Sequence, residues 1–272
     1  MKGKLYVVGT PIGNLGDLSP RAAETLRKVD FIAAEDTRVT VKLLNHLGIK
    51  KEMLSYYEHN KSTKGNLILE RLLMGETCAV VSDAGMPAIS DPGEDLVRLC
   101  HENEIPVESV PGPSALITAI SISGFPCGRF CFEGFLSMNK PSRKTHLADL
   151  KTEKRTMIFY EAPHKLLATL KDMLVHFGNR EIVLVRELTK IHETVFKTTI
   201  SDAIEHYEQN SPKGEFVLLI KGAEENDDSY TLEQAIKIAK DLIKDGCSTS
   251  SAAKQAAEIT GFKKGEIYKE LI

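Results

Sequence analysis

The sequence has no tryptophan, few aromatic residues and no excess of basic charge. Aromatic residues make up 6% of its 272 positions, and the formal net charge is −3 at pH 7. Proteins held on nucleic acid mainly by bulk electrostatics need clustered Lys and Arg, so this composition argues against that class. An RNA enzyme of this charge would depend on local patches or on shape. With 42% hydrophobic and 27% charged residues, the chain has the composition of a globular protein with room for two domains.

The five cysteines form no metal-binding pattern. Cys127 and Cys131 are four positions apart, but no second pair or nearby His completes a site. The odd count and the lack of a recognisable signal peptide favour reduced thiols in the cytoplasm. We therefore expect a cytoplasmic protein without a bound metal. The remaining cysteines are Cys78, Cys100 and Cys247.

Long hydrophobic runs and a dinucleotide-binding glycine pattern are also missing. The longest stretch without charge, residues 109–128, contains three prolines and many Ser and Gly residues, so it does not predict a membrane span. Gly9, Gly13 and Gly16 lack the spacing of the nucleotide fingerprint, which excludes an NAD-binding interpretation.

What the sequence does contain is a long polar loop at residues 82–93, Ser-Asp-Ala-Gly-Met-Pro-Ala-Ile-Ser-Asp-Pro-Gly. The apolar run 77–81 before it predicts a buried strand. After it, Asp91 and Pro92 are expected to serve as N-cap and first residue of a helix. Ligands of α/β sheets bind at the carboxyl ends of strands, where this loop must lie. Glycine lets backbone approach a ligand closely, so the loop predicts a binding site.

This loop resembles the signature of the ribosomal RNA small-subunit methyltransferase I family. Residues 9–14 (Gly-Thr-Pro-Ile-Gly-Asn), 35–38 (Glu-Asp-Thr-Arg) and the pair His59-Asn60 match further motifs of that family. The resemblance covers most of residues 3–222. It implies a fold similar to the tetrapyrrole methylases and homodimers. It also implies an S-adenosylmethionine-dependent transfer of methyl to the ribose 2′-hydroxyl of a cytidine in the decoding region of 16S rRNA.

The same resemblance implies a cofactor folded into a cleft between two domains. The central loop, the first loop, the turn at residues 111–115 and the start of the second domain would border it. The cofactor-binding residues expected from this placement are Pro11, Asp83, Ala84, Gly85, Pro87, Ala88, Ser90, Ser114, Ala115 and Tyr160.

A ribose hydroxyl is a weak nucleophile, so a positioned base should assist its attack. We expect Glu35 or Asp36 to be that base, with His59, next to Asn60, as the rival. Arg38 is suited to binding a phosphate or carboxylate through two hydrogen bonds. From residues alone, a helix cap with a surface ion pair is the alternative interpretation of the acidic pair and Arg38.

The substrate expected from the resemblance is 16S rRNA in the small ribosomal subunit, and its contacts should come from cations near the cleft. Residues 140–155 carry six Lys or Arg against two acids, which indicates a basic rim or an ordinary solvated helix face. Lys190 and His192 could complete the wall facing RNA. The substrate-binding residues expected are Arg38, Arg143, Lys144, Lys190 and His192.

The order of elements predicts an α/β protein of two domains with a cofactor cleft between them, followed by a small helical module. Five strands alternating with helices predict a parallel sheet in residues 1–123. Adjacent strands without a helix predict a mixed sheet in 124–223. An acidic linker at 224–229 precedes three short helices in a helical extension spanning 229–272, which resembles a helix-turn-helix.

Two other functions fit the sequence. A small-molecule methyltransferase acting on a tetrapyrrole shares the implied fold, although the acid-Arg cluster and the basic stretch suit a phosphate-bearing substrate better. A non-catalytic RNA-binding or assembly module could also retain the fold, and it would not bind S-adenosylmethionine.

Overall fold

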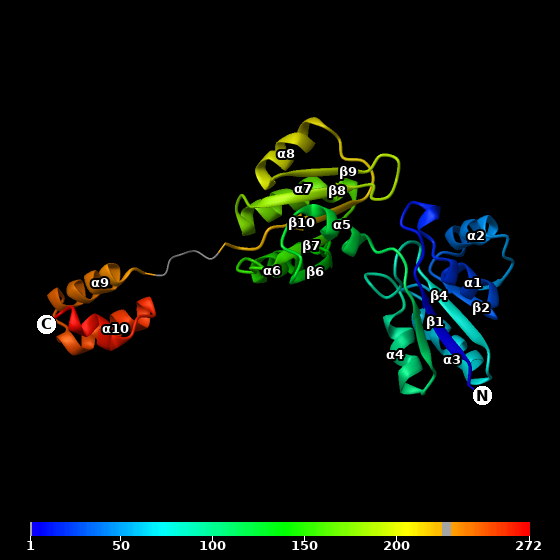
Figure 1. The fold of residues 1–272 in the computed structure, drawn as a ribbon, viewed down its shortest axis with the longest axis horizontal. Coiled ribbons are helices and arrows are strands. Elements are labelled where there is room, and N and C mark those ends of the chain that lie inside the picture. Colours follow the sequence, from blue (N-terminus) through cyan, green and yellow to red (C-terminus); the bar gives the residue numbers. More distant parts are fainter. Residues whose placement is uncertain (1, 225–229) are drawn as a thin grey trace. The chain divides into compact units, whose positions relative to one another are not determined.

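The computed structural model describes residues 2–224 and 230–272, which form two compact units, Met1–Ala223 and Glu224–Ile272 (Figure 1). The acidic linker expected at 224–229 lies, except for Glu224, outside the described residues. No helix within the two described ranges is both long and apolar enough to span a membrane.

The first sheet of Met1–Ala223 is entirely parallel, as the alternation of elements predicts. Its strand order is β3-β2-β4-β1-β5. The strands are β1 (Lys4–Val8), β2 (Phe31–Ala34), β3 (Glu52–Ser55), β4 (Thr77–Val81) and β5 (Val107–Val110). Because every connection is a crossover, the carboxyl ends of all five strands lie at one edge, and their loops meet there.

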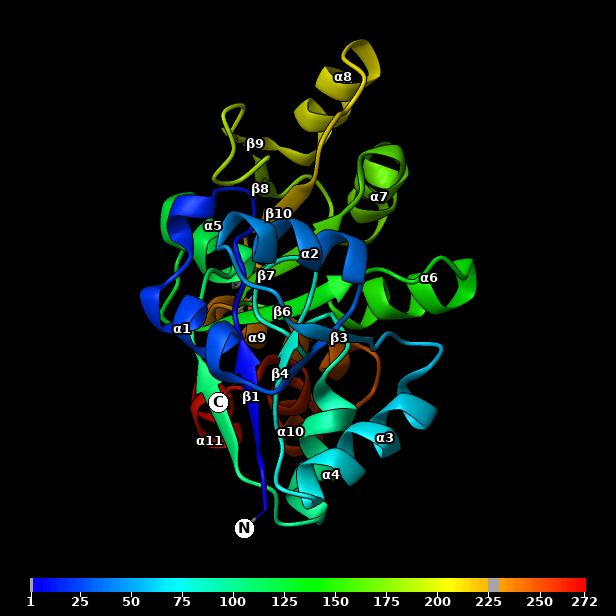
Figure 2. The same cartoon turned by 90° about the vertical axis from the view of Figure 1, so that its right-hand side faces the viewer.

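Helices cover both faces of this sheet. On one face α1 (Pro20–Lys28) and α2 (Thr37–His46) bury Leu26 and Leu44 against Ile32. On the other, α3 (Lys61–Leu73) and α4 (Glu94–Glu102) lie next to each other (Figure 2) and share a core with Phe31. Burial on both sides explains why β2 and β4 read as continuous apolar runs. A short 3₁₀ turn, η1 (Leu15–Asp17), precedes α1.

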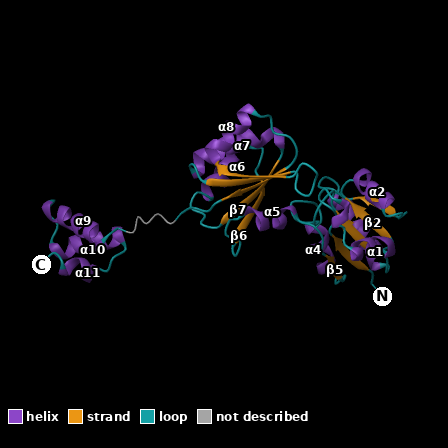
Figure 3. Cartoon of the chain, turned by 45° about the horizontal axis from the view of Figure 1, so that its top comes forward, coloured by secondary structure: helices purple, strands orange, loops and turns teal. Residues whose placement is uncertain are grey.

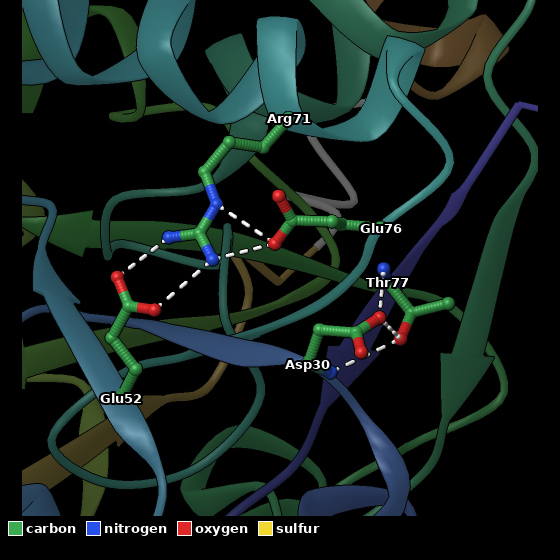
Figure 4. Close-up of polar contacts among 5 residues, drawn as sticks. All are labelled: Asp30, Glu52, Arg71, Glu76 and Thr77. Atoms are coloured by element: carbon green, nitrogen blue, oxygen red, sulfur yellow. Dashed lines mark hydrogen bonds and ion pairs between the residues drawn. The ribbon is translucent and has the colours of Figure 1, made fainter.

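At the amino-terminal edge of the sheet, an ion-pair cluster joins three elements (Figure 4). Arg71 of α3 binds Glu52 at the start of β3, with Nη1 and Oε1 2.6 Å apart, and also binds Glu76 before β4. The Asp30 carboxylate accepts hydrogen bonds from the amide and the hydroxyl of Thr77, both at 2.7 Å. These contacts stabilise the starts of the strands. The loops that follow the strands lie at the opposite, carboxyl-terminal edge of the sheet.

The second sheet is mixed, as predicted, because only β6 and β7 run parallel. Its order is β6-β7-β10-β8-β9. On one face lie three helices, α6 (Lys140–Asp149), α7 (Pro163–Phe177) and α8 (Ile200–Gln209), and on the other lies α5 (Ala115–Ser123) (Figure 3). The strands are β6 (Phe130–Phe135), β7 (Thr156–Glu161), β8 (Glu181–Arg186), β9 (Thr194–Thr199) and β10 (Phe216–Ile220).

Helix α5 links the two sheets. It follows β5 in the chain, yet its buried residues Ala119 and Ile120 pack with Val217 and Leu219 of β10. The helix therefore belongs to the hydrophobic core of the second sheet, although the sequence expectation assigns it to residues 1–123. The division at residue 123 stays a prediction.

The start of α4 differs from the expectation. The helix begins at Glu94 with Gly93 as N-cap at φ 144°, so Asp91 is not the cap and Pro92 is not its first residue. The carbonyl of Pro92 instead accepts the amide of Ala88 at 3.3 Å. This hydrogen bond closes a turn within the loop and leaves the Asp91 carboxyl for the site described below.

The unit Glu224–Ile272 consists, in its described part, of α9 (Leu232–Lys244), α10 (Thr249–Thr260) and α11 (Lys264–Lys269), in line with the three predicted helices. Thr231 begins α9 with a capping box, in which its side chain and that of Gln234 each accept the other's backbone amide. Alanines, among them Ala239 and Ala253, fill the core with Ile267. Small side chains let these helices pack closely.

Candidate active site

A cavity of about 590 Å³ lies at the carboxyl ends of β2 and β4 and extends to the second sheet. This volume is in the range of small-molecule sites. Eight of the expected site residues line it: Glu35, Asp83, Ala84, Gly85, Ser90, Ser114, Ala115 and Tyr160. The structure therefore brings the central loop, the turn before α5 and β7 together around one space.

Two acidic residues that line this cavity, Glu35 and Asp83, each accept a hydrogen bond from a backbone amide of the other's loop. The amide of Asp83 donates to Oε2 of Glu35 at 3.2 Å, and the amide of Asp36 donates to Oδ1 of Asp83 at 3.1 Å. These bonds join the loops that follow two adjacent parallel strands, β2 and β4. Each of the two acids keeps one oxygen outside this pair of hydrogen bonds.

Burial raises the pKa of three carboxyl groups around the cavity. Desolvation is the main cause for Glu35, for Asp83 and for Asp91, whose pKa reaches about 6, and repulsion from neighbouring carboxylates adds to it. Two further acids, Glu161 and Glu215, line the same cavity, whereas no Lys or Arg does among the described residues. A cationic ligand suits such a site, and a phosphate does not.

Asp36 and Arg38 have a different environment. Asp36 is the N-cap of α2, where it accepts the amide of Arg38 at 2.8 Å. The Arg38 guanidinium binds the same carboxylate, with Nη2 and Oδ2 2.6 Å apart. This pairing lowers the pKa of Asp36 to about 2. Neither residue lines the cavity. They form the helix cap and the surface ion pair of the alternative interpretation, and their roles in catalysis or substrate binding stay predictions.

The backbone of the central loop is held in an uncommon conformation. Gly85 has φ 85° and exchanges backbone hydrogen bonds with Thr10 at 2.9 and 3.1 Å. Ala88 and Ser90 also have positive φ, at 71° and 65°. Non-glycine residues rarely adopt these angles, and such positions cluster at functional sites.

Tyr160 contributes structure as well as surface. Its hydroxyl accepts the amide of Leu116 at 3.0 Å, in the first turn of α5. Its ring lies edge-on to Phe132 and Phe135, with centroids 4.9 and 5.5 Å away. The side chain thereby joins β7, β6 and α5 at the wall of the cavity.

Several expected residues lie elsewhere. Pro11, Pro87 and Ala88 are not among the residues that line the cavity. His59 is exposed, and both ends of the Asn60 amide bind the turn after β3: Oδ1 accepts the amide of Tyr57 and Nδ2 donates to the carbonyl of Ser55. Asn60 therefore shapes the chain and does not reach the cavity.

The expectation that Arg143 contacts substrate is wrong. The residue is buried between α6 and α7, where Nη2 donates to the Thr169 hydroxyl at 3.0 Å and Nε pairs with Asp172 at 2.8 Å. Thr169 in turn donates to Glu161. Arg143 faces the core although its neighbour Lys144 is exposed. A count of basic residues along the stretch does not show which of them is buried.

The ammonium of Lys190 lies 2.9 Å from carboxylates of both Glu187 and Glu215. These pairings neutralise it, so its charge is already matched within the chain. His192 is exposed on the same loop. Neither residue lines the cavity.

The wall also contains residues beyond the individually expected ones. Four of them, Ile12, Met86, Ile89 and Asp91, belong to the first loop and the central loop, which were expected to border the cofactor. The sequence expectations missed the others, which are Phe135, Glu161–His164, Val185, Leu188 and Glu215–Val217. Glu161–His164 follows a strand, contains proline and begins a helix, as the recognised motifs do, so that signal was available. The residues of β8 and β10 read as ordinary core strands, and nothing local marks them.

Comparison with known proteins places this architecture. The family model of tetrapyrrole (corrin/porphyrin) methylases matches residues 4–204. A protein of Xylella fastidiosa named ribosomal RNA small subunit methyltransferase I is 48% identical over 269 residues, covering 98% of each chain. One of the same name from Synechocystis is 47% identical, covering 98% of this chain and 96% of its own.

Solved structures agree on the fold. Uroporphyrin-III C-methyltransferase of Thermus thermophilus superposes with a TM-score of 0.58 at 20% identity, covering 81% of this chain and 94% of its own. Cobalt-precorrin-4 methyltransferase, a cobalamin biosynthetic enzyme, gives 0.61 at 19% identity, covering 80% and 94%. The chain thus belongs to the tetrapyrrole methylase family and, within it, to the group of ribosomal RNA small subunit methyltransferase I proteins, as its motifs indicate.

Proposed function

We propose that the chain is an S-adenosylmethionine-dependent methyltransferase that methylates the ribose 2′-hydroxyl of a cytidine in the decoding region of 16S rRNA. Relatives named for the small-subunit RNA align along nearly its whole length. The observation that carries the proposal is the charge of the cavity: five acidic side chains and, in the described chain, no Lys or Arg.

That charge fits the cofactor. S-adenosylmethionine carries a sulfonium and an ammonium group, so its two cations complement carboxylates whose pKa is raised by burial and by neighbouring carboxylates. Asp83, Gly85, Ser114, Ala115 and Tyr160 would hold it. When bound, S-adenosylmethionine supplies an electrophilic methyl group on a sulfonium whose departure leaves a neutral thioether.

The residue we assign as general base is Glu35. Its carboxyl group lines the cavity, and one oxygen is fixed by the amide of Asp83. A carboxyl with a raised pKa accepts a proton more readily at neutral pH than one with an ordinary pKa. Asp36, the other candidate, is engaged by Arg38 and is a poor proton acceptor with a pKa of about 2. The protein would orient the ribose oxygen and take its proton.

RNA phosphates would lie outside this acidic cavity, against exposed cations such as Arg38 and Lys144. The partner would be 16S rRNA in the small ribosomal subunit, and the setting the cytoplasm. We also propose a homodimer, since α5 exposes Ile117 and Ile122, with 52% and 43% of their surface accessible.

The likeness to tetrapyrrole enzymes supports a second candidate, methylation of a small tetrapyrrole. Natural tetrapyrroles that receive methyl groups are rich in carboxylates, which five acids would repel. We therefore place this candidate second.

The test is transfer of tritiated methyl groups from S-adenosylmethionine to undermethylated small ribosomal subunits, with nuclease mapping of the product. A 2′-O-methylcytidine in the decoding region is the expected result. Binding of S-adenosylmethionine without transfer to RNA would overturn the RNA assignment and favour the tetrapyrrole candidate. Absence of cofactor binding in calorimetry would leave only a non-catalytic module.

A further inference from the structure

A second, smaller cavity of about 270 Å³ lies between the β1–α1 loop and helix α2. We call it the α2 pocket. Its walls come from Pro11, Gly13 and Leu15 on the loop and from Val39, Thr40, Lys42 and Leu43 on the helix, and its floor from Thr10, Ser82 and Asp83. The volume suits one nucleotide unit better than a folded cofactor.

The α2 pocket has features of a ligand site. Leu15 and Val39, which line it from the loop and from the helix, are large apolar residues with 49% and 36% of their surface exposed. The hydroxyl of Thr40 makes no hydrogen bond to any residue that the structure describes, and it is not among the fully buried polar atoms, so it is open to a ligand. Apolar walls beside an available hydroxyl fit a flat, heteroaromatic ligand with polar edges.

The α2 pocket differs from the large cavity in having a cation, Lys42, in its lining beside a single acid, Asp83. Lys42 lines it and forms no ion pair within residues 2–224 and 230–272, and Arg38 lies one turn earlier on the same helix. The side chain of Arg38 is 88% exposed, so its guanidinium can reach a ligand while it keeps Asp36. Two cations beside an apolar slot suit a phosphate attached to a base.

One residue lines both cavities, and it is Asp83. Its amide binds Glu35, the base assigned above. A methyl transfer needs two reactants that meet at contact distance, and Asp83 is the residue that the linings of the two cavities have in common.

We infer that the α2 pocket holds the acceptor nucleotide of the RNA, with its base between Leu15 and Val39 and a phosphate at Lys42, so that the ribose meets the cofactor cavity at Asp83. The inference rests on the proposed function and names its acceptor site. The ribose oxygen gains the methyl carbon as the carbon–sulfur bond breaks, and its proton passes to Glu35. A base in this slot must leave the RNA stack.

The experiment compares two valines of α2. Val39→Glu places a charge in the α2 pocket, whereas Val41→Glu places the same charge two residues on, where helix geometry turns the side chain away. Val41 is as exposed as Val39, at 37%, and does not line the pocket. RNA binding is measured by fluorescence polarisation of a decoding-region fragment with S-adenosylhomocysteine present, methyl transfer with small subunits, and cofactor affinity by calorimetry.

We expect Val39→Glu to weaken RNA binding and to raise the KM for RNA at least about tenfold, the cost of a charge in an apolar slot. Cofactor affinity should not change, and Val41→Glu should match the wild type. A third variant, Lys42→Met, should lower the salt slope of RNA binding by about 0.7.

If Val39→Glu and Val41→Glu have the same RNA affinity and the same KM, and both still transfer methyl groups, the assignment of the α2 pocket to the acceptor nucleotide is wrong and the proposed function stands. If the wild type binds the fragment and Val39→Glu alone weakens it, but no transfer occurs, the pocket stands and the proposed reaction fails. A wild type that neither binds the fragment nor methylates subunits overturns both.

Discussion

Glu35 and Asp36 are neighbours in the chain, but their carboxyl groups lie in opposite environments. The side chain of Glu35 faces the cavity, where burial raises its pKa. Asp36 caps α2 and pairs with Arg38, which lowers its pKa to about 2. A sequence motif cannot assign these roles, because they depend on which side of a strand end each residue faces.

The first prediction separates the two acids. Glu35→Gln should reduce the rate constant of methyl transfer roughly 10²- to 10⁴-fold, the range for loss of a general base, while S-adenosylmethionine still binds. Asp36→Asn keeps a good N-cap residue and should change the rate only a few-fold. Single-turnover kinetics with small subunits measures both. Equal losses in the two variants would remove Glu35 from the role of base.

The second prediction concerns Asp91, whose pKa rises from 3.8 to about 6 in the folded chain. Between these values the folded state binds more protons than the unfolded state, so this group lowers stability as pH increases from about 4 to 6. The Asp91→Asn variant has no carboxyl group to titrate here. Its free energy of unfolding should therefore rise relative to that of the wild type as the pH increases from about 4 to 6, and the difference should stay constant above pH 6. Urea unfolding at several pH values measures this. A difference independent of pH would contradict the raised pKa.

At the scale of elements, the cavity-lining loops of the first sheet could be predicted from the sequence, because each of them follows an apolar strand and contains Gly, Pro or acidic residues. Parallel topology then brings those loops together. The contributions of the second sheet were not predictable from local sequence: Val185 and Val217 belong to regular strands, and only the packing of α5 beside them creates a wall. Arg143 shows the same limit, since charge alone does not tell a buried side chain from an exposed one.

The third prediction tests that buried arginine. Arg143 binds Thr169, which also binds Glu161 at the cavity wall. Arg143→Met keeps the length of the side chain but leaves buried polar partners unsatisfied, so it should lower the free energy of unfolding by about 1–3 kcal/mol. Lys144→Met, at the adjacent exposed position, should change it by no more than about 0.5 kcal/mol. Chemical denaturation of both variants decides. If Arg143→Met is as stable as Lys144→Met, the buried network contributes nothing.

At the scale of the whole molecule, charge is divided between regions. The amino-terminal edge of the first sheet carries the ion pairs around Arg71, which also stacks on Phe31 with its guanidinium carbon 3.7 Å from the ring centroid. The carboxyl edge carries acids of the cavity, among them Glu35, Asp83 and Asp91, beside which no Lys or Arg lines the cavity in the described chain. A net charge of −3 for the whole chain therefore says little about any one region and does not exclude local binding of RNA.

The last prediction concerns the unit Glu224–Ile272. All residues of the large cavity and of the α2 pocket belong to Met1–Ala223, which has its own hydrophobic cores. Ending the chain after Ala223 should therefore leave the affinity for S-adenosylmethionine unchanged in calorimetry. Any change should appear in the KM for ribosomal subunits, which would assign the three helices to substrate binding. A truncated protein that folds by circular dichroism but no longer binds the cofactor would show that the helices support the cavity itself.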